Sequence, residues 1–110
     1  MPASNKFMQL LDTLLTRTKR GKARWTPGSR DDTFIWSGSS ASVAVLTRDN
    51  DGAPPWMVRI IDDDGRTIEE EMFLPNETGY DLVSELYNVA RADALDITAA
   101  IESLLGDLQD

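Results

Sequence analysis

The sequence predicts an α+β domain, with one helix before an antiparallel meander sheet and two helices after it. Apolar residues recur at helical spacing near both ends of the chain, whereas residues 23–73 form short β-branched and aromatic segments separated by turns. No helical pattern interrupts those segments, so the crossover helices that parallel strands need are missing. We therefore expect four or five antiparallel strands in a single domain spanning residues 1–110.

The first helix is expected over residues 4–20, and Gly21 should end it. Ser4 is a suitable N-cap residue because its hydroxyl can accept a hydrogen bond from the first helical turn. The apolar positions with helical spacing are Phe7, Leu10, Leu11, Leu14 and Leu15. They predict one buried face.

Three short strands are expected next, at residues 23–26, 33–37 and 42–48. The first two are separated by Pro27-Gly28 and a polar segment, and the second and third by a Gly-Ser-Ser turn. Residues 49–55 read as a loop because they contain a glycine and two prolines, which do not fit a central strand.

Residues 56–73 form the clearest two-strand unit, a β-hairpin around the three-residue turn Asp63-Asp64-Gly65 with Gly65 in the left-handed conformation. The expected pairs are Asp62 with Arg66, Ile60 with Ile68, Arg59 with Glu69 and Trp56 with Met72. A register shifted by one would place glutamates opposite Val58 and Ile60, so the first register is preferred.

Two further helices are expected after the hairpin. Thr78 and Asp81 resemble a capping box that opens the first of them, which should run to about residue 91 and bury Leu82, Val83, Leu86, Val89 and Ala90. Asp96 is the expected N-cap of the second. The buried side expected for this last helix consists of Ile97, Ile101, Leu104, Leu105 and Leu108.

The net charge of −8 hides an asymmetry along the chain. Residues 1–30 hold seven bases and one acid, a charge of +6, and the remaining residues hold four bases and eighteen acids, a charge of −14. Two interpretations stay open: the two regions neutralise each other in the fold, or the basic stretch is a docking patch. The candidate basic docking patch consists of Arg17, Lys19, Arg20, Lys22 and Arg24.

The candidate chemistry is sparse because the chain has no cysteine and no histidine. Thiolate, disulfide and zinc-finger chemistry are excluded, and the usual proton shuttle at neutral pH is missing. The acids at positions 62–64 and 69–71 do not match a calcium-binding loop, so we interpret the Asp-Gly sequence as a turn. We expect no cofactor, no metal and no catalytic residue.

Nucleic-acid binding would place the basic patch on phosphates and stack Trp25 on a base. The charge of −14 on residues 31–110 would repel a polyanion, so the sequence disfavours this role. No apolar segment approaches membrane-spanning length, and Asp12 interrupts the apolar N-terminal pattern. We expect a cytoplasmic protein.

Apolar residues fall on both faces of the predicted sheet. Either the three helices divide between the faces, or they cover one face and leave the other for a partner. The candidate interaction face consists of Ile35, Leu46, Met57, Ile61 and Phe73.

A resemblance covers most of the chain. The segments LLDTLLTRTKRGKARW, RIIDDDGRTIE and LVSELYNVARADALDITAAIESLL, in this order, resemble small uncharacterised bacterial single-domain proteins known as hypothetical proteins. The resemblance implies a helix, a β-meander and two helices, and it attaches no activity to them.

The sequence therefore favours a non-enzymatic protein-interaction domain, of a regulatory or chaperone-like adaptor type. Such a domain would bind a protein partner or form a homodimer through a sheet face. The alternative is a small-ligand-binding or hydrolytic domain that uses carboxylates in a cleft near the tryptophans.

Overall fold

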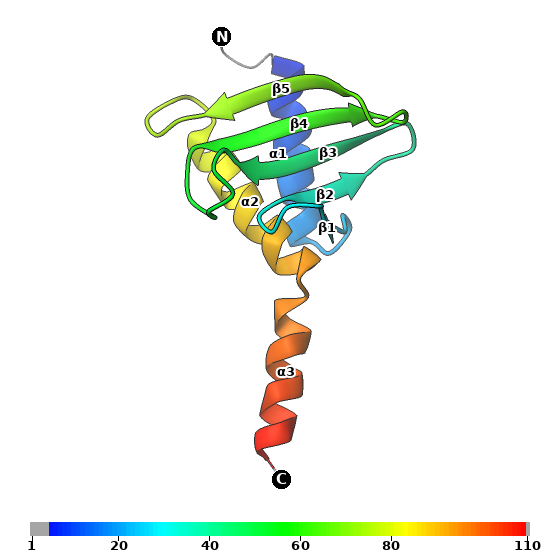
Figure 1. The fold of residues 1–110 in the computed structure, drawn as a ribbon, viewed down its shortest axis with the longest axis vertical. Helices are drawn as coiled ribbons and strands as arrows, with labels where there is room; N and C mark the ends of the chain where they lie inside the picture. Colours follow the sequence, from blue (N-terminus) through cyan, green and yellow to red (C-terminus); the bar gives the residue numbers. More distant parts are fainter. Residues whose placement is uncertain (1–4, 110) are drawn as a thin grey trace.

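The computed structural model describes residues 5–109 and has the expected α+β architecture (Figure 1). A helix precedes a five-stranded sheet, and two helices follow it. The elements are α1 (Asn5–Lys19), β1 (Thr26–Pro27), β2 (Phe34–Ser37), β3 (Ala41–Thr47), β4 (Trp56–Asp62), β5 (Thr67–Phe73), α2 (Tyr80–Ala94) and α3 (Ile97–Leu108). The expected N-cap Ser4 lies outside the described residues.

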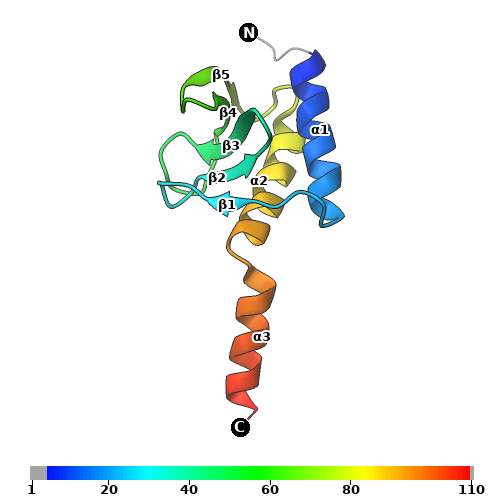
Figure 2. The same ribbon diagram turned by 90° about the vertical axis from the view of Figure 1, so that its right-hand side faces the viewer.

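The sheet is a simple antiparallel meander with the strand order β1-β2-β3-β4-β5. Figure 2 shows that α1 and α2 lie on the same side of this sheet, with α2 nearer to the sheet. We call the side that faces these helices the inner face. The opposite side is the outer face.

The main core lies between the inner face, α1 and α2. Four side chains of α1 that the sequence placed on its apolar face are buried in this core, namely Phe7, Leu11, Leu14 and Leu15. They meet Val83, Leu86, Tyr87 and Ala90 of α2. Tyr87 packs its ring on Trp56 in a stacked arrangement and on Phe34 edge to face, with ring centroids 4.6 and 5.6 Å away. The helical spacing thus predicted the apolar stripes of α1 and α2, although Leu10, Leu82 and Val89 are only partly buried and the buried Tyr87 was not among the predicted residues.

The β4–β5 hairpin has the expected turn but not the expected register. The amide of Asp62 donates to the Arg66 carbonyl, and Gly65 has a φ of +85°, as the three-residue turn requires. Beyond the turn, an irregularity between Ile60 and Ile61 shifts the pairs by one, so that Val58, Ile60 and Arg59 lie opposite Glu71, Glu69 and Glu70. The register that the sequence argument rejected is therefore the correct one for most of the hairpin.

A β-bulge at Ile68 reconciles the turn with the shifted ladder, because the extra residue lets one strand slip by one position. The shift places Phe73 opposite Trp56 and Met72 opposite Met57. Phe73 consequently belongs to the main core, and its assignment to the face of Met57 was wrong.

The N-terminal end of α2 also differs from the prediction. Its N-cap is Gly79, with a φ of +91°, and no side chain caps the helix. The expected capping box of Thr78 and Asp81 is therefore wrong. A Cβ at Gly79 would lie 2.8 Å from Met8 Cε and 3.0 Å from Phe73 Cε1, so the close approach of α1 and β5 requires glycine there.

Helix α3 departs most from the prediction, because none of its residues is buried. It leaves the body beyond the end of α2 and points away from the sheet (Figure 1). The described chain measures 55 × 33 × 26 Å, with a radius of gyration of 14.8 Å. A compact chain of this length has a radius of gyration of about 13 Å. The expected burial of Ile97, Ile101, Leu104, Leu105 and Leu108 within the chain is thus wrong.

Candidate interaction surface

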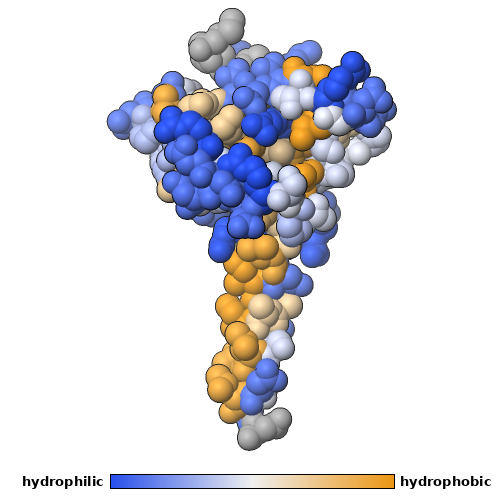
Figure 3. All heavy atoms as spheres, viewed as in Figure 1, coloured by the Kyte–Doolittle hydropathy of each residue, from blue (hydrophilic) through white to orange (hydrophobic). Residues whose placement is uncertain are grey.

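The apolar side of α3 forms a continuous exposed stripe (Figure 3). The α3 stripe consists of Ile97, Ile101, Leu104, Leu105 and Leu108. At 100° per residue these side chains occupy about 100° of the helix circumference. The exposed fractions are 52% for Ile101, 61% for Leu104, 51% for Leu105 and 82% for Leu108. Water-exposed leucines at this density are typical of a surface that binds another protein.

The flanks of the α3 stripe are acidic. Glu102 and Asp107 are the only charged residues in the helix, and each lies about 60° from the edge of the stripe. Asp96, the residue before the helix, has the left-handed conformation with φ +49° and ψ +53°. Gly106 lies opposite the stripe, and a Cβ there would have nothing within 4 Å. The helix therefore presents an apolar stripe with negative borders.

The base of α3 is held by contacts between the end of α2 and the segment before β1. The Trp25 amide donates to Asp93 Oδ2 at 2.6 Å, and Arg24 Nε lies 3.2 Å from Asp93 Oδ1. The Trp25 indole Nε1 donates to Thr18 Oγ1 at 2.9 Å. Residues of α1, α2 and the connection to β1 are thus joined where α3 begins, and Trp25 is buried rather than available to stack on a base.

A second apolar surface lies between α1 and the inner face of the sheet. Two adjoining hollows of about 220 and 390 Å³ share Leu10 and Ile60 in their walls. We call this surface the α1–sheet groove, and its apolar lining is Phe7, Leu10, Trp36, Val43, Ile60 and Ile68. Ile68 is 60% exposed, and Leu10, Trp36 and Ile60 are half-buried. Helix α2 covers the other part of the inner face.

The rim of the α1–sheet groove carries positive charge from α1. Lys6 lines the larger hollow together with Glu69 of β5. Arg17 follows Lys6 by eleven residues, which is three turns of helix, so both lie on the same side of α1 as Leu10. Within residues 5–109, neither Lys6 nor Arg17 forms an ion pair.

The sheet-face residues singled out in the sequence offer little free surface. Leu46 is fully buried, Met57 is 8% exposed, and Ile35 and Ile61 are half-buried beside them. The β1–β2 loop covers part of this outer face: Arg30 Nη2 donates to the Thr47 carbonyl at 3.0 Å, and Gly28 approaches Ile35. The β1–β2 loop therefore covers part of this apolar cluster. A role for it in binding a partner stays a prediction.

The candidate basic docking patch does not form one continuous surface. Lys19 pairs with Glu85 of α2, and Arg24 pairs with Asp93. Arg17, Arg20 and Lys22 line a shallow hollow of about 340 Å³ whose wall also includes Asp12. Part of the basic segment therefore neutralises the acidic one, as the first of the two charge interpretations expects.

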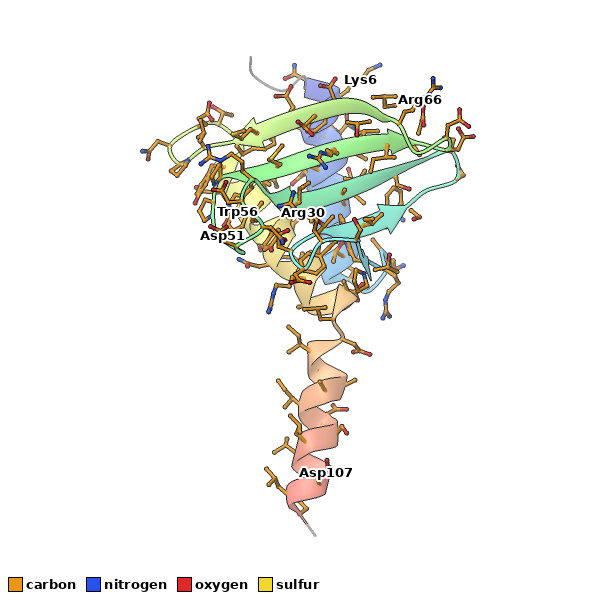
Figure 4. The ribbon with its side chains drawn as sticks, viewed as in Figure 1. Lys6, Arg30, Asp51, Trp56, Arg66 and Asp107 are labelled. Atoms are coloured by element: carbon orange, nitrogen blue, oxygen red, sulfur yellow. The ribbon has the colours of Figure 1, made fainter. Side chains whose placement is uncertain are left out.

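A buried polar cluster anchors the loops at one end of the sheet. Asp32 accepts a hydrogen bond from the Thr47 amide at 3.1 Å, and its own amide donates to Asn50 Oδ1 at 3.2 Å. Figure 4 shows Arg30, Asp51 and Trp56 in this region. Three buried side-chain atoms of the cluster have no hydrogen-bond partner in the described chain, namely Asp32 Oδ1, Thr33 Oγ1 and Trp56 Nε1.

Tyr87 adjoins this cluster through its stack on Trp56. Burial raises the pKa of the Tyr87 phenol, and the nearby negative charge of Asp32 and Asp51 raises it further, while Arg91 opposes the shift. The neutral phenol is therefore the form that the fold favours.

The acids of the β4–β5 turn have a structural explanation. Asp62 Oδ1 accepts hydrogen bonds from the amides of Asp64 and Arg66, and Asp62 Oδ2 accepts one from Arg66 Nε at 3.2 Å. Carboxylate oxygens of Asp62, Asp63 and Asp64 lie within 4.8 Å of one another and could in principle ligate a cation. Two of these three carboxylates are exposed, and the Arg66 guanidinium already forms ion pairs with Asp62 and Asp64. The turn therefore has its own cation in Arg66.

Comparisons with protein-family models, with curated proteins and with solved structures found no match to this chain. Among the described residues, no helix combines the length and the apolar character needed to cross a membrane. The resemblance to small bacterial proteins stays a prediction, and any function must be argued from the surfaces described above.

Proposed function

We propose that this chain is a non-enzymatic protein-interaction domain in which α3 is the docking element. The observation that carries the proposal is the α3 stripe, in which Ile101, Leu104, Leu105 and Leu108 are exposed to water and no side chain is buried. A helix of twelve residues gains too few hydrogen bonds to be stable in isolation. Its helical form therefore requires packing against a partner, which the rest of its own chain does not supply.

The body of the domain suits the role of a scaffold. Its core is closed by α1 and α2, and Trp25 and Asp93 fix the direction in which the chain leaves α2. The partner-binding surface proposed here is α3. The sequence favoured the outer face of the sheet, but the β1–β2 loop covers part of that face. We also propose a cytoplasmic location, which the cysteine-free composition supports.

The proposal is tested by changing the stripe in the full chain. We expect the double variant Leu104→Asp, Leu105→Asp to lose association with its protein partner, because two carboxylates in a buried interface cost several kcal/mol. The matched control is Ala99→Asp, Ser103→Asp, which adds the same charge to the same helix at exposed positions about 100° or more from the edge of the stripe. Association would be measured by sedimentation of the purified chain and by affinity capture from the source cell.

The proposal predicts that wild type and control retain the same partner and that the stripe variant loses it. Circular dichroism should show that the body of the stripe variant stays folded, because no buried side chain is altered. Retention of the partner by the stripe variant would contradict the proposal. So would a wild-type chain that associates neither with itself nor with any captured protein.

The buried polar cluster supports a second candidate function, the binding of a small polar ligand. Its specific support is the buried Thr33 Oγ1 and Trp56 Nε1, which have no hydrogen-bond partner in the described chain, beside Asp32 Oδ1, which has only an ion pair with Arg30 at 3.7 Å; buried polar groups normally have a hydrogen-bond partner. A ligand that binds the folded state must raise the melting temperature. A metabolite that stabilises wild type but not Asp32→Asn would favour this function, and a full panel without effect would rule against it.

A further inference from the structure

We infer that α3 docks on a second copy of this chain, in the α1–sheet groove of that copy, and that the two copies exchange their α3 helices reciprocally. This inference rests on the proposed function, because it names the partner of the α3 stripe. It makes the chain a dimer in which each body receives one apolar helix.

The groove and the stripe complement each other in shape and polarity. Three half-buried side chains of the groove, Leu10, Trp36 and Ile60, lack full cover, and Ile68 is 60% exposed. Helix α3 is about 18 Å long, and the groove crosses the four strands β2 to β5, a width of about 14 Å. A helix laid in the groove would cover the part of the inner face that α2 leaves open.

The groove and the stripe also complement each other in charge. Lys6 lines the groove on the α1 side, and Asp107 lies about 60° from the edge of the α3 stripe. With α3 in the groove, the Asp107 carboxylate can lie opposite the Lys6 ammonium.

The directions of the helices agree with this charge pair. In Figure 1, α1 and α3 run in the same direction along the long axis of the molecule. A two-fold axis perpendicular to that long axis reverses the second copy, so α3 of one chain runs antiparallel to α1 of its partner. This arrangement places Asp107, near the end of α3, beside the start of the partner's α1, where Lys6 lies. The symmetry required by reciprocal exchange thus agrees with the Lys6–Asp107 pair.

Helix α3 is less able to bind the α1–sheet groove of its own chain. Two residues, Leu95 and Asp96, connect α2 to α3. The connection from α1 to β1 crosses beside the end of α2 in Figure 2, and Trp25 in that connection is bonded to Asp93. This crossing segment stands between the start of α3 and the groove of its own chain.

A pair of α3 helices from two chains is also less favourable. Within residues 97–108 the helix has two acids and no base, so two stripes packed on each other would bring four carboxylates together without a cation. Like charges along the edges of a helix pair are destabilising. The α1–sheet groove instead offers the cation of Lys6 to the acidic helix.

The first test measures the mass of the full chain by sedimentation equilibrium. Wild type should have twice the chain mass of 12.2 kDa. Ile68→Asp places a charge in the groove and should give monomers, whereas Met72→Asp, on the outer face of the same strand and 40% exposed, should leave the dimer intact. A monomeric wild type, or a dimer that Ile68→Asp does not weaken while circular dichroism shows a folded chain, would overturn the inference.

The second test uses the absence of native cysteine to place two thiols without competition. In one chain Lys6 and Asp107 lie at opposite ends of the molecule (Figure 4). We expect a mixture of the single variants Lys6→Cys and Asp107→Cys to form a disulfide-linked heterodimer on mild oxidation, and a mixture of Lys6→Cys with Thr98→Cys to form much less. Equal linkage in both mixtures would contradict the proposed seat.

The two proposals fail in distinguishable ways. If the stripe variant Leu104→Asp, Leu105→Asp abolishes dimerisation but Ile68→Asp does not, α3 docks on another surface, and the proposed function stands while the groove is excluded. If a chain carrying both cysteines links within itself and remains monomeric, α3 occupies its own groove and the exchange is excluded. If neither the stripe nor the groove variant changes the association, both proposals fail.

Discussion

Trp25 donates its backbone N–H to the carboxylate of Asp93 at 2.6 Å, and this hydrogen bond joins the connection before β1 to the end of α2, 68 residues further along the chain. The same carboxylate faces Arg24. The contact lies where the body ends and α3 begins, so it sets the direction in which α3 leaves the domain.

Removing this anchor should destabilise the body. We expect Asp93→Ala to lower the free energy of unfolding by about 1–3 kcal/mol, because the hydrogen bond is to a charged acceptor and the Trp25 amide loses its partner. Arg24→Ala should cost less than about 1 kcal/mol, since Arg24 is largely exposed. Urea denaturation measures both values. Equal effects of the two substitutions would contradict the importance of the backbone hydrogen bond.

The neighbouring acids Asp31 and Asp32 should respond differently to replacement by alanine. Asp32 is buried and accepts a hydrogen bond from the Thr47 amide, so Asp32→Ala should cost about 2–3 kcal/mol. Asp31 is exposed, and Asp31→Ala should change stability by no more than about 0.5 kcal/mol. Thermal and urea denaturation of the pair compare them directly. An Asp32→Ala chain as stable as wild type would show that the loop anchor is absent in solution.

The β-bulge at Ile68 makes Glu70, rather than Glu69, the partner of Arg59. A double-mutant cycle with Arg59→Ala and Glu70→Ala should give a coupling energy of about 0.5 kcal/mol that decreases at high salt, because both side chains are partly exposed. The cycle with Glu69→Ala should give no coupling. Coupling of Arg59 to Glu69 instead would restore the register expected from the sequence.

Stability should decrease at high pH through Tyr87. Burial, followed by the charges of Asp32 and Asp51, raises the folded-state pKa of Tyr87 above its ordinary value near 10. A raised folded-state pKa means that the stabilisation by the neutral phenol is fully present below about pH 10 and is lost as the pH rises through the folded-state value. Wild type should lose more stability than Tyr87→Phe between about pH 9 and 11. Parallel losses in wild type and Tyr87→Phe would disagree with the shift.

Gly106→Ala should strengthen association. Glycine in a helix interior costs about 1 kcal/mol relative to alanine, and a Cβ at position 106 lies away from the stripe with nothing within 4 Å. Each docked helix should gain up to about fivefold in binding, which a sedimentation dilution series can measure. Weaker association would mean that position 106 touches the partner or that α3 docks without being helical.

Hydrophobic spacing predicted α1 and α2 correctly because their apolar stripes are covered by the sheet and by each other. The same spacing in α3 identified Leu104 and Leu105 as one apolar side, but a periodic pattern contains no information about what covers that side. Whether a helix has an apolar stripe and whether its own chain buries that stripe are separate questions. The predicted burial of α3 assumed that the first implies the second, but α3 has an apolar stripe and no buried residue.

The hairpin shows a similar division. The Asp-Gly turn was predictable because a left-handed residue is required there and Gly65 supplies it. The bulge at Ile68 was not predictable, because one extra residue changes the apolar–polar alternation of the strand very little. It nevertheless moves Phe73 to the other face of the sheet. The α1–sheet groove was equally hidden, because Leu10, Trp36 and Ile60 each look like ordinary core residues. Their incomplete cover becomes visible once the helices are placed.

Both proposals require the α3 stripe to be an intermolecular contact. Sedimentation equilibrium of the full chain, wild type beside Leu104→Asp, Leu105→Asp, tests it most directly. The account predicts a wild-type mass of twice 12.2 kDa and a stripe variant at 12.2 kDa with an unchanged circular dichroism signal from the body. A wild-type chain that remains monomeric at every concentration, or a stripe variant that remains dimeric, would contradict it.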